Sequence, residues 1–137
     1  MELTVTPITV HKRFPLTISR GTTAQTTNLW VKLKQDDIEG WGEAVPFSVG
    51  GGKRQDTNLL QKQLNEITPT LTQLNPLARS RIQTTLRTAK ISSAVRSAID
   101  VACYDWLGKR TGLPLWQVLG LDISESVPIS VTIGISS

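Results

Sequence analysis

The sequence predicts an α+β fold in which a three-stranded antiparallel meander is followed by a helical bundle. The first third of the chain alternates apolar and polar residues in short runs, which is the pattern of strands with one buried face. The middle of the chain instead repeats apolar residues at helical spacing. We expect the meander over residues 1–47 and the helices over residues 54–120, within one domain of residues 1–122.

The alternating runs predict strands over residues 1–14, 26–34 and 38–45, with a turn at residues 35–37. Pro7 lacks the N–H that a central ladder requires. It therefore favours an edge position or a bulge for the first strand.

The segments around these strands carry further signals. Residues 17–25 are polar, and we interpret them as a flexible loop that crosses between two strands. Gly40 and Gly42 stand on both sides of Trp41, which indicates a close backbone approach or a bulge. Glu43 follows directly, and a buried carboxylate at this position would need a partner.

The longest helical pattern covers residues 92–112 and predicts the core helix. A hydroxyl of Ser92 or Ser93 can cap its start, and Gly112 can adopt the left-handed conformation that ends it. Pro114 then stands where a short second helix would begin. Small residues on the inner face would let another backbone approach closely. The predicted inner stripe consists of Val95, Ile99, Ala102 and Trp106, widened by Ala94, Ala98 and Val101.

Two further helices are expected before this one. A row of leucines predicts a helix over residues 56–67, which Pro69 should end. Asn75 can cap a helix and Pro76 suits the first helical position, so this pair predicts a second helix that reaches residue 86.

Beyond the helices, residues 127–135 alternate again and place five apolar residues on one face. Such a strand needs a sheet. It therefore either joins the N-terminal meander or is the first strand of a further structure that this sequence does not contain. We interpret residues 123–137 as a linker followed by this strand.

Composition excludes several classes of protein. Hydrophobic residues make up 39% and charged residues 19% of the 137 residues, which argues against general disorder. No apolar run approaches the roughly 20 residues of a membrane-spanning helix, and the N-terminus lacks the pattern of a signal peptide. Cys103 is the single cysteine and cannot form an internal disulfide. These features predict a cytoplasmic protein with no membrane partner.

Positive charge is concentrated in residues 53–96, where eight basic residues minus two acidic ones give a local net charge of +6. One interpretation is a solvated helical face, and the other is a surface for nucleic acid or an acidic partner. Aromatic residues are not interleaved with these charges, which disfavours nucleic acid.

Groups that could carry catalysis are few. His11 is the single histidine, so the sequence offers neither a catalytic triad nor a histidine metal site. Cys103 lies in a helix interior, where a buried thiol is inert. Asp100 and Asp105 fall on different faces of the core helix, and we expect them to anchor neighbouring layers through hydrogen bonds or ion pairs. Taken alone, the chain does not predict a complete enzyme.

Two motifs in this order resemble the N-terminal capping domain of the enolase superfamily. The nearest branch is the muconate-lactonizing-enzyme-like group, which includes the L-Ala-D/L-Glu dipeptide epimerases. The first motif is Gly40-Trp41-Gly42-Glu43-Ala44, and the second is Ala94…Ala98-Ile99-Asp100…Ala102…Tyr104-Asp105…Gly108-Lys109…Gly112-Leu113-Pro114…Leu119-Gly120.

The resemblance implies an enzyme of two parts, in which this chain is the cap and a (β/α) barrel supplies the chemistry. Residues 127–135 would be the first strand of that barrel, the rest of which lies beyond this sequence. The implied reaction is a Mg²⁺-dependent epimerisation of a dipeptide by removal of an alpha proton. A muconate cycloisomerase or an o-succinylbenzoate synthase relative is the alternative.

In this family the lysine bases and the acidic magnesium ligands lie on barrel strands. The resemblance therefore implies no catalytic residue and no metal ligand in this chain. We expect magnesium in the full-length enzyme, and we expect the 137 residues alone to be inactive and to bind no cofactor.

Within the cap, the resemblance implies four substrate-binding residues. Arg20 lies in a mobile lid loop and would bind the acidic side chain of the substrate, because a guanidinium fork binds a carboxylate through two hydrogen bonds. Phe47 and Val49 belong to the second cap loop, which lines the pocket. Thr132 would line the pocket from the last strand.

The implied partner is a small-molecule substrate, a dipeptide or another carboxylate, bound together with the barrel. An unpaired last strand and a surface that would face the barrel predict self-association into a homo-oligomer. A different class of function stays open, namely a free-standing basic binding module without catalysis. Its binding would fall steeply with salt concentration.

Overall fold

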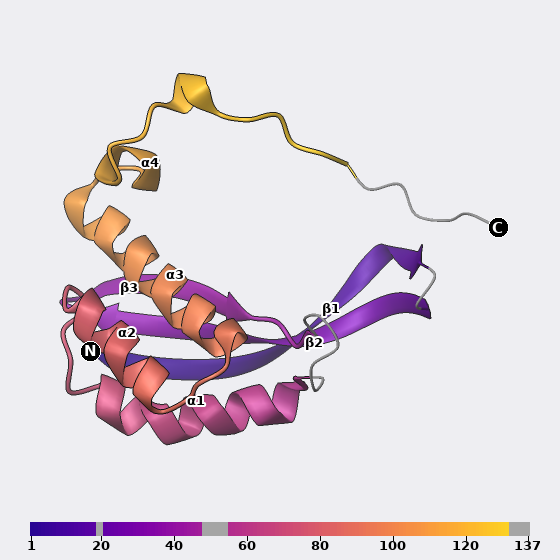
Figure 1. Ribbon diagram of the computed structural model, residues 1–137, viewed down its shortest axis with the longest axis horizontal. Helices are drawn as coiled ribbons and strands as arrows, with labels where there is room; N and C mark the ends of the chain where they lie inside the picture. Colours follow the sequence, from indigo (N-terminus) through magenta and orange to yellow (C-terminus); the bar gives the residue numbers. More distant parts are fainter. Residues whose placement is uncertain (19–20, 48–54, 132–137) are drawn as a thin grey trace.

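The computed structural model describes residues 1–18, 21–47 and 55–131. A three-stranded antiparallel sheet carries helices on one face, and the last part of the chain runs away from this body (Figure 1). The predicted α+β class, with a meander before the helices, is confirmed.

The sheet consists of β1 (Glu2–Ile18), β2 (Gly21–Gln35) and β3 (Ile38–Ala44), in the order β1-β2-β3. The predicted turn joins β2 to β3, and its two aspartates have positive φ angles of 53° and 59°. This conformation is typical of a two-residue hairpin turn. Pro7 lies in β1, which is an edge strand as predicted.

β1 and β2 extend beyond β3 as a two-stranded arm, formed by residues 10–18 and 21–26 (Figure 1). Residues 17–18 and 21–25 belong to these two strands, so the prediction of a flexible loop is wrong for them. The threonines of the arm have β-branched side chains that favour extended backbone. The hydroxyl groups of Thr17 and Thr22 form a cross-strand hydrogen bond of 2.9 Å.

Helix α1 (Thr57–Leu71) begins at Asp56, whose side chain accepts a hydrogen bond of 2.8 Å from a backbone N–H of the first turn. Pro69 lies inside the last turn, so the prediction that it ends the helix is wrong. A proline this near the end removes one backbone hydrogen bond without breaking the turns before it. In the same region the Thr68 hydroxyl donates to the Leu64 carbonyl oxygen at 2.7 Å.

Helix α2 (Arg79–Thr88) begins later than Asn75 and Pro76 predict. The Asn75 side chain accepts a hydrogen bond of 2.9 Å from Leu77 N–H. The Ala78 N–H donates to the Asn75 carbonyl oxygen at 2.9 Å. The Asn-Pro pair thus forms a separate turn ahead of the helix.

Helix α3 (Ser93–Thr111) is the predicted core helix, and Gly112 ends it with a φ angle of 66°. Ser92 makes no side-chain capping hydrogen bond, so the predicted cap is not formed there. Its backbone N–H instead donates to the Gln63 side-chain oxygen at 3.2 Å.

α3 crosses β3 at short range because β3 has glycines, Gly40 and Gly42, at the contact. A Cβ atom at Gly40 would overlap the carbonyl oxygen of Ala102, and one at Gly42 would overlap that of Ala98. The predicted close backbone approach is confirmed. Val101 points away from this contact and is 50% exposed, so its predicted place in the core is wrong.

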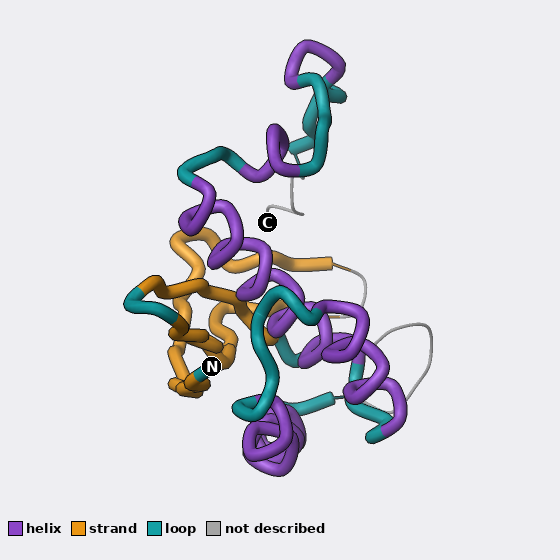
Figure 2. Tube along the Cα trace, turned by 90° about the vertical axis from the view of Figure 1, so that its left-hand side faces the viewer, coloured by secondary structure: helices purple, strands orange, loops and turns teal. Residues whose placement is uncertain are grey.

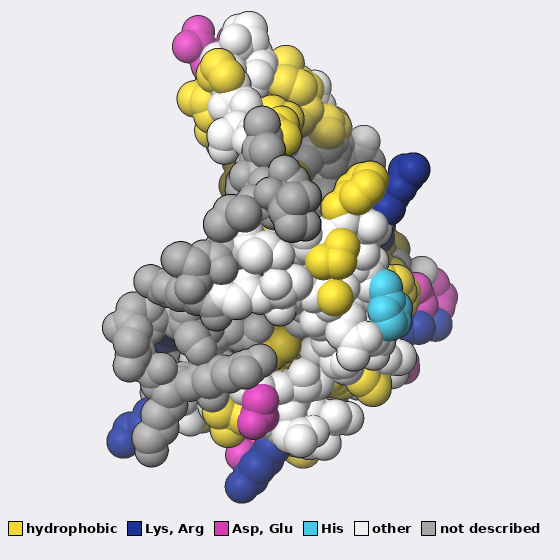
Figure 3. All heavy atoms as spheres, turned by 90° about the vertical axis from the view of Figure 1, so that its right-hand side faces the viewer, with side chains coloured by type: hydrophobic (Ala, Val, Ile, Leu, Met, Phe, Trp, Pro, Cys, Tyr) yellow, Lys and Arg dark blue, Asp and Glu magenta, His cyan; other side chains and the backbone are white. Residues whose placement is uncertain are grey.

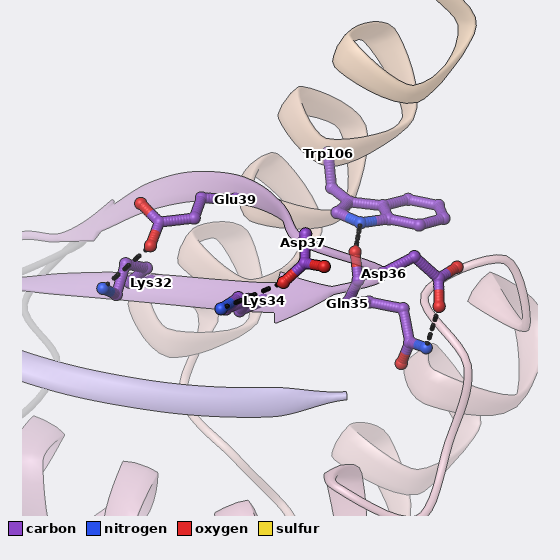
Figure 4. A network of polar contacts seen from close by, with 7 residues as sticks. All are labelled: Lys32, Lys34, Gln35, Asp36, Asp37, Glu39 and Trp106. Atoms are coloured by element: carbon purple, nitrogen blue, oxygen red, sulfur yellow. Dashed lines mark hydrogen bonds and ion pairs between the residues drawn. The ribbon is translucent and has the colours of Figure 1, made fainter.

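The core lies between the inner face of the sheet and the three long helices (Figures 1 and 2). Trp106 is its largest fully buried side chain. The indole Nε1–H donates to the Gln35 carbonyl oxygen at 2.9 Å, beside the turn that joins β2 to β3 (Figure 4). This bond fixes α3 to the end of the sheet. The inner face of β2 contributes Leu29, Val31 and Leu33.

After α3 the chain forms α4 (Leu115–Val118) and a 3₁₀ turn, η1 (Ile123–Glu125). This part stands apart from the body and carries a group of hydrophobic side chains (Figure 3). The strand predicted over residues 127–135 is not formed in its described part, residues 127–131, which lie away from the sheet. Val127, Ile129 and Val131 are 82%, 91% and 84% exposed.

Candidate substrate-facing surface

Phe47 is the one predicted substrate-binding residue that lies within the described part of the chain. It follows Val45 and Pro46 at the end of β3, and 54% of its surface is exposed. One hollow of about 290 Å³ lies between Phe47 and the start of α3. Another of about 450 Å³ lies between Phe47, the arm and the start of α1. Phe47 is therefore a shared wall that an apolar group of a ligand can contact.

The smaller hollow combines apolar surface with hydroxyl groups and the carboxylate of Glu43. Val45 and Phe47 line it from the end of β3, and Ser93 and Ser97 line it from the first turns of α3. The close packing of α3 on β3 brings these two groups of residues together. This arrangement can hold an apolar group of a ligand against Val45 and Phe47 and donate hydrogen bonds from Ser93 and Ser97 to a polar atom of the same ligand.

The larger hollow is bounded by polar residues that already have structural roles. The Asp56 carboxylate caps α1, and Thr57 Oγ1 donates to the Thr27 carbonyl oxygen at 2.6 Å. The start of α1 is thereby tied to β2 beside Phe47.

Arg20, Val49 and Thr132 lie outside the described residues. Their predicted roles stay predictions. The described flanks are the paired residues Ile18 and Gly21 on either side of the segment that holds Arg20.

Asp100 and Asp105 are both layer anchors, as predicted. Asp100 Oδ1 accepts hydrogen bonds from Arg79 Nη2 at 2.7 Å and from Gln83 Nε2 at 3.1 Å, which ties α2 to α3. The Arg79 guanidinium also lies 3.5 Å from the centre of the Tyr104 ring.

Asp105 anchors α3 to the open edge of β3. Its Oδ2 atom accepts a hydrogen bond from Trp41 N–H at 2.8 Å and pairs with Lys109 Nζ at 2.7 Å. Lys109 Nζ also donates to the Glu39 carbonyl oxygen at 2.9 Å. Both carboxylates of α3 are thus engaged in structure.

Reactive groups do not gather anywhere in the described residues. No three of their His, Cys, Asp and Glu side chains lie close enough together to hold a metal ion. Cys103 is buried, and desolvation together with the charge of Asp100 raises the pKa of its thiol to about 11. At neutral pH such a thiol is almost entirely protonated and inert. The described helices also include none that is long and apolar enough to cross a bilayer.

The outer face of the sheet, which no helix covers, holds a feature that was not predicted (Figure 1). Trp30 of β2 and Trp41 of β3 have ring centres 5.7 Å apart and planes at 82°. They border a hollow of about 480 Å³ together with Glu43. A sequence signal did exist, because Trp30 alternates with Leu29 and Val31 and so belongs on the outer face.

Residues 1–120 match the family model described as mandelate racemase / muconate lactonizing enzyme, N-terminal domain. A curated relative, the hydrophobic dipeptide epimerase of Flavobacteria bacterium (strain MS024-2A), is 35% identical over 136 residues. The match covers 99% of this chain and 38% of the relative.

Solved structures show the same fold. The N-succinyl Arg/Lys racemase from Bacillus cereus ATCC 14579 superposes with a TM-score of 0.86 at 27% identity, covering 99% of this chain and 38% of that one. An enolase-superfamily member from Roseovarius nubinhibens ISM, complexed with magnesium, gives a TM-score of 0.72 at 28% identity, covering 86% and 32%. This chain thus spans well under half the length of the proteins that it matches.

Proposed function

We propose that this chain is the capping part of a dipeptide epimerase, because it belongs to the mandelate racemase / muconate lactonizing enzyme N-terminal domain family. The observation that carries the proposal is the 35% identity to a hydrophobic dipeptide epimerase over 99% of this chain. Since the chain spans 38% of that relative, the reaction is a property proposed for the whole protein.

The exposed Phe47 supports a substrate with an apolar side chain. Ligand pockets are lined mainly by apolar and aromatic groups, with a few polar groups that fix orientation. The Phe47 ring supplies the apolar wall, and the hydroxyls of Ser93 and Ser97 supply polar groups in the same hollow. In this proposal the cap binds the substrate and excludes water, while the rest of the protein supplies the acid and base.

Magnesium belongs to the proposal only through the rest of the protein. When bound, the ion would stabilise the negative charge that develops as the alpha proton leaves. One solved relative contains magnesium. The described residues of this chain do not fit the ion, because no three of them form a ligand group. We therefore place its ligands outside the described chain.

A second candidate is an N-succinyl amino acid racemase. The solved racemase from Bacillus cereus superposes on 99% of this chain with a TM-score of 0.86. The two candidates differ in the group attached to the substrate nitrogen, which is an aminoacyl group with a cationic amine in a dipeptide and an anionic succinyl group in the alternative.

The test uses the longest reading frame that contains this chain, expressed and assayed with Mg²⁺ in D₂O. NMR would follow deuterium incorporation at the alpha carbon of L-Ala-L-Leu, L-Ala-L-Glu and N-succinyl-L-Arg. We expect exchange to be at least tenfold faster for L-Ala-L-Leu than for N-succinyl-L-Arg. Exchange confined to N-succinyl-L-Arg would favour the racemase, and no exchange with any of the three would contradict both candidates.

Two substitutions in the cap sharpen this test. Phe47→Ala should raise the KM for L-Ala-L-Leu by roughly tenfold, since a lost apolar contact costs about 1–3 kcal/mol. Arg20→Ala should impair L-Ala-L-Glu alone if Arg20 binds an acidic side chain. Leu77→Ala is a matched control, because Leu77 is 55% exposed and lies at neither hollow beside Phe47. Equal effects of Phe47→Ala and Leu77→Ala would contradict the role of Phe47.

A further inference from the structure

We infer that the hollow bordered by Trp30, Trp41 and Glu43 is a binding site for a cation, an ammonium or guanidinium group. This hollow has a volume of about 480 Å³ and lies between the outward-facing side chains of β2 and β3 and Val101 of α3. The inference does not depend on the reaction proposed above, although Glu43 also lines the smaller hollow beside Phe47.

The two tryptophans form an aromatic corner. In the register of β2 and β3, Trp30 lies opposite Glu43 and Trp41 lies opposite Lys32, so all four side chains project from the same face. The ring planes meet at 82°, and the exposed Val101 completes the lining. Two perpendicular indoles can present π-electron density to one small guest, which is how aromatic cages attract ammonium groups.

Glu43 supplies negative charge to the same corner. Its Oε1 atom accepts a hydrogen bond of 2.6 Å from Asn28 Nδ2, and Asn28 is buried. The carboxylate is thus held in place by a neutral group. Among the ion pairs between described residues, none includes Glu43.

Lys32 shows that this surface already attracts a cation. Its Nζ atom lies 5.6 Å from the centre of the Trp41 ring. It is held there by Glu39 at 3.0 Å (Figure 4). The Trp41 ring therefore already has Lys32 of the neighbouring strand as its cation. We infer that the Glu43 carboxylate can pair with a cation that does not belong to this sheet.

The outside cation has two possible sources with the same chemistry. One is a free small molecule that carries an ammonium group. The other is a lysine or arginine side chain of a second copy, since the chain has 15 such residues and a net charge of +4.

The first experiment titrates choline into the 137-residue chain and follows the four tryptophan indole N–H signals by ¹H–¹⁵N NMR. We expect saturable shifts of the Trp30 and Trp41 signals. Trp106 is an internal control, because its ring is buried and its N–H is bonded to Gln35. The uncharged isostere 3,3-dimethyl-1-butanol should bind at least threefold more weakly. Equal responses to the two probes, or no saturable response to choline, would overturn the inference.

Variants test the assigned parts of the site. Trp30→Leu should weaken choline binding by roughly two- to fivefold, the range of one exposed cation–π contact. Glu43→Gln should also weaken it, because the negative charge beside the bound cation is lost. Lys32→Gln should strengthen it, because a neighbouring positive charge is removed. Phe14→Leu is the matched control, since Arg13 also lies over the Phe14 ring, at 5.3 Å, but on the arm. Loss of binding in Phe14→Leu to the same extent as in Trp30→Leu would contradict the site.

Sedimentation velocity then separates the two sources. A chain that stays monomeric and binds choline has a site for a free cation. A chain that self-associates, and that choline or Glu43→Gln converts to monomer, uses the cation of a second copy. Self-association that neither choline nor Glu43→Gln alters, in a chain whose indole signals do not respond to choline, would overturn the inference.

Discussion

Gly42 determines how closely α3 can approach the sheet. A Cβ atom at this position would overlap the carbonyl oxygen of Ala98 and lie 3.2 Å from the backbone nitrogen of Ala102. Both atoms belong to the helix backbone, which cannot rotate aside as a flexible side chain can. The absence of a side chain at one residue therefore sets the distance between two elements.

Replacing Gly42 by alanine should lower the free energy of unfolding by about 3 kcal/mol, at the upper end of typical overpacking effects. The reason is that α3 must move away from β3 to admit the methyl group. Urea denaturation followed by circular dichroism would measure the change. Gly108→Ala is the matched control, because its Cβ atom would only come within 3.2 Å of the Leu113 carbonyl oxygen. Similar losses in the two variants would contradict the close approach at Gly42.

At the scale of elements, α3 protects the open edge of β3. Asp105 accepts the hydrogen bond of Trp41 N–H, and Lys109 donates to the Glu39 carbonyl oxygen. The unpaired groups of an edge strand are a template for pairing with another chain. Asp105 and Lys109 lie one helical turn apart on α3, and they bind two backbone groups of β3 that another strand would otherwise pair with.

Asp105→Ala should expose the Trp41 amide and accelerate its hydrogen exchange at least tenfold. A hydrogen bond to a charged group contributes about 1.5–3 kcal/mol, and its loss frees this amide to open. Exchange measured by NMR, residue by residue, would show whether the change is confined to β3. Glu66→Ala serves as control, because Glu66 pairs with Lys62 at 3.9 Å on an exposed surface. Unchanged protection of Trp41 in Asp105→Ala would show that the carboxylate does not guard this edge.

Local sequence signals identified the elements better than their ends. Asn75 and Pro76 do form a turn, yet α2 begins only at Arg79, because the signal for a cap and the signal for a turn use the same side-chain hydrogen bond. Pro69 predicts the end of α1, but a proline in a last turn removes only one backbone hydrogen bond. The polar residues of the arm predict a loop in the sequence because the arm has no buried face that would make apolar and polar residues alternate.

At the scale of the whole molecule, the fold class and the family resemblance were predictable from periodicity and from two motifs, and both are confirmed. The corner formed by Trp30 and Trp41 was not predictable in the same way. It depends on the register between β2 and β3, which the turn at Asp36 and Asp37 sets. Of the four predicted substrate-binding residues, Phe47 alone is described; it borders a hollow, and its role in substrate binding stays a prediction.

The distribution of burial predicts which part of the chain is needed for folding. Every buried hydrophobic residue of the described chain lies at or before Trp106. By contrast, Leu121, Ile123 and Ile129 are 58%, 61% and 91% exposed. Exposed apolar side chains contribute little to the stability of the monomer, because burial is what stabilises them.

A chain that ends at Gly120 should therefore unfold with a free energy within about 1 kcal/mol of the full 137 residues, the range of surface changes. A chain that ends at Thr111 should lose more, since it lacks the backbone hydrogen bonds from Gly112 to Lys109 and from Leu113 to Gly108 that close α3. Urea denaturation of the three chains would compare them. If removal of residues 121–137 alone destabilises the protein as much as the longer truncation, the C-terminal segment packs on the body and its apolar side chains are part of the core.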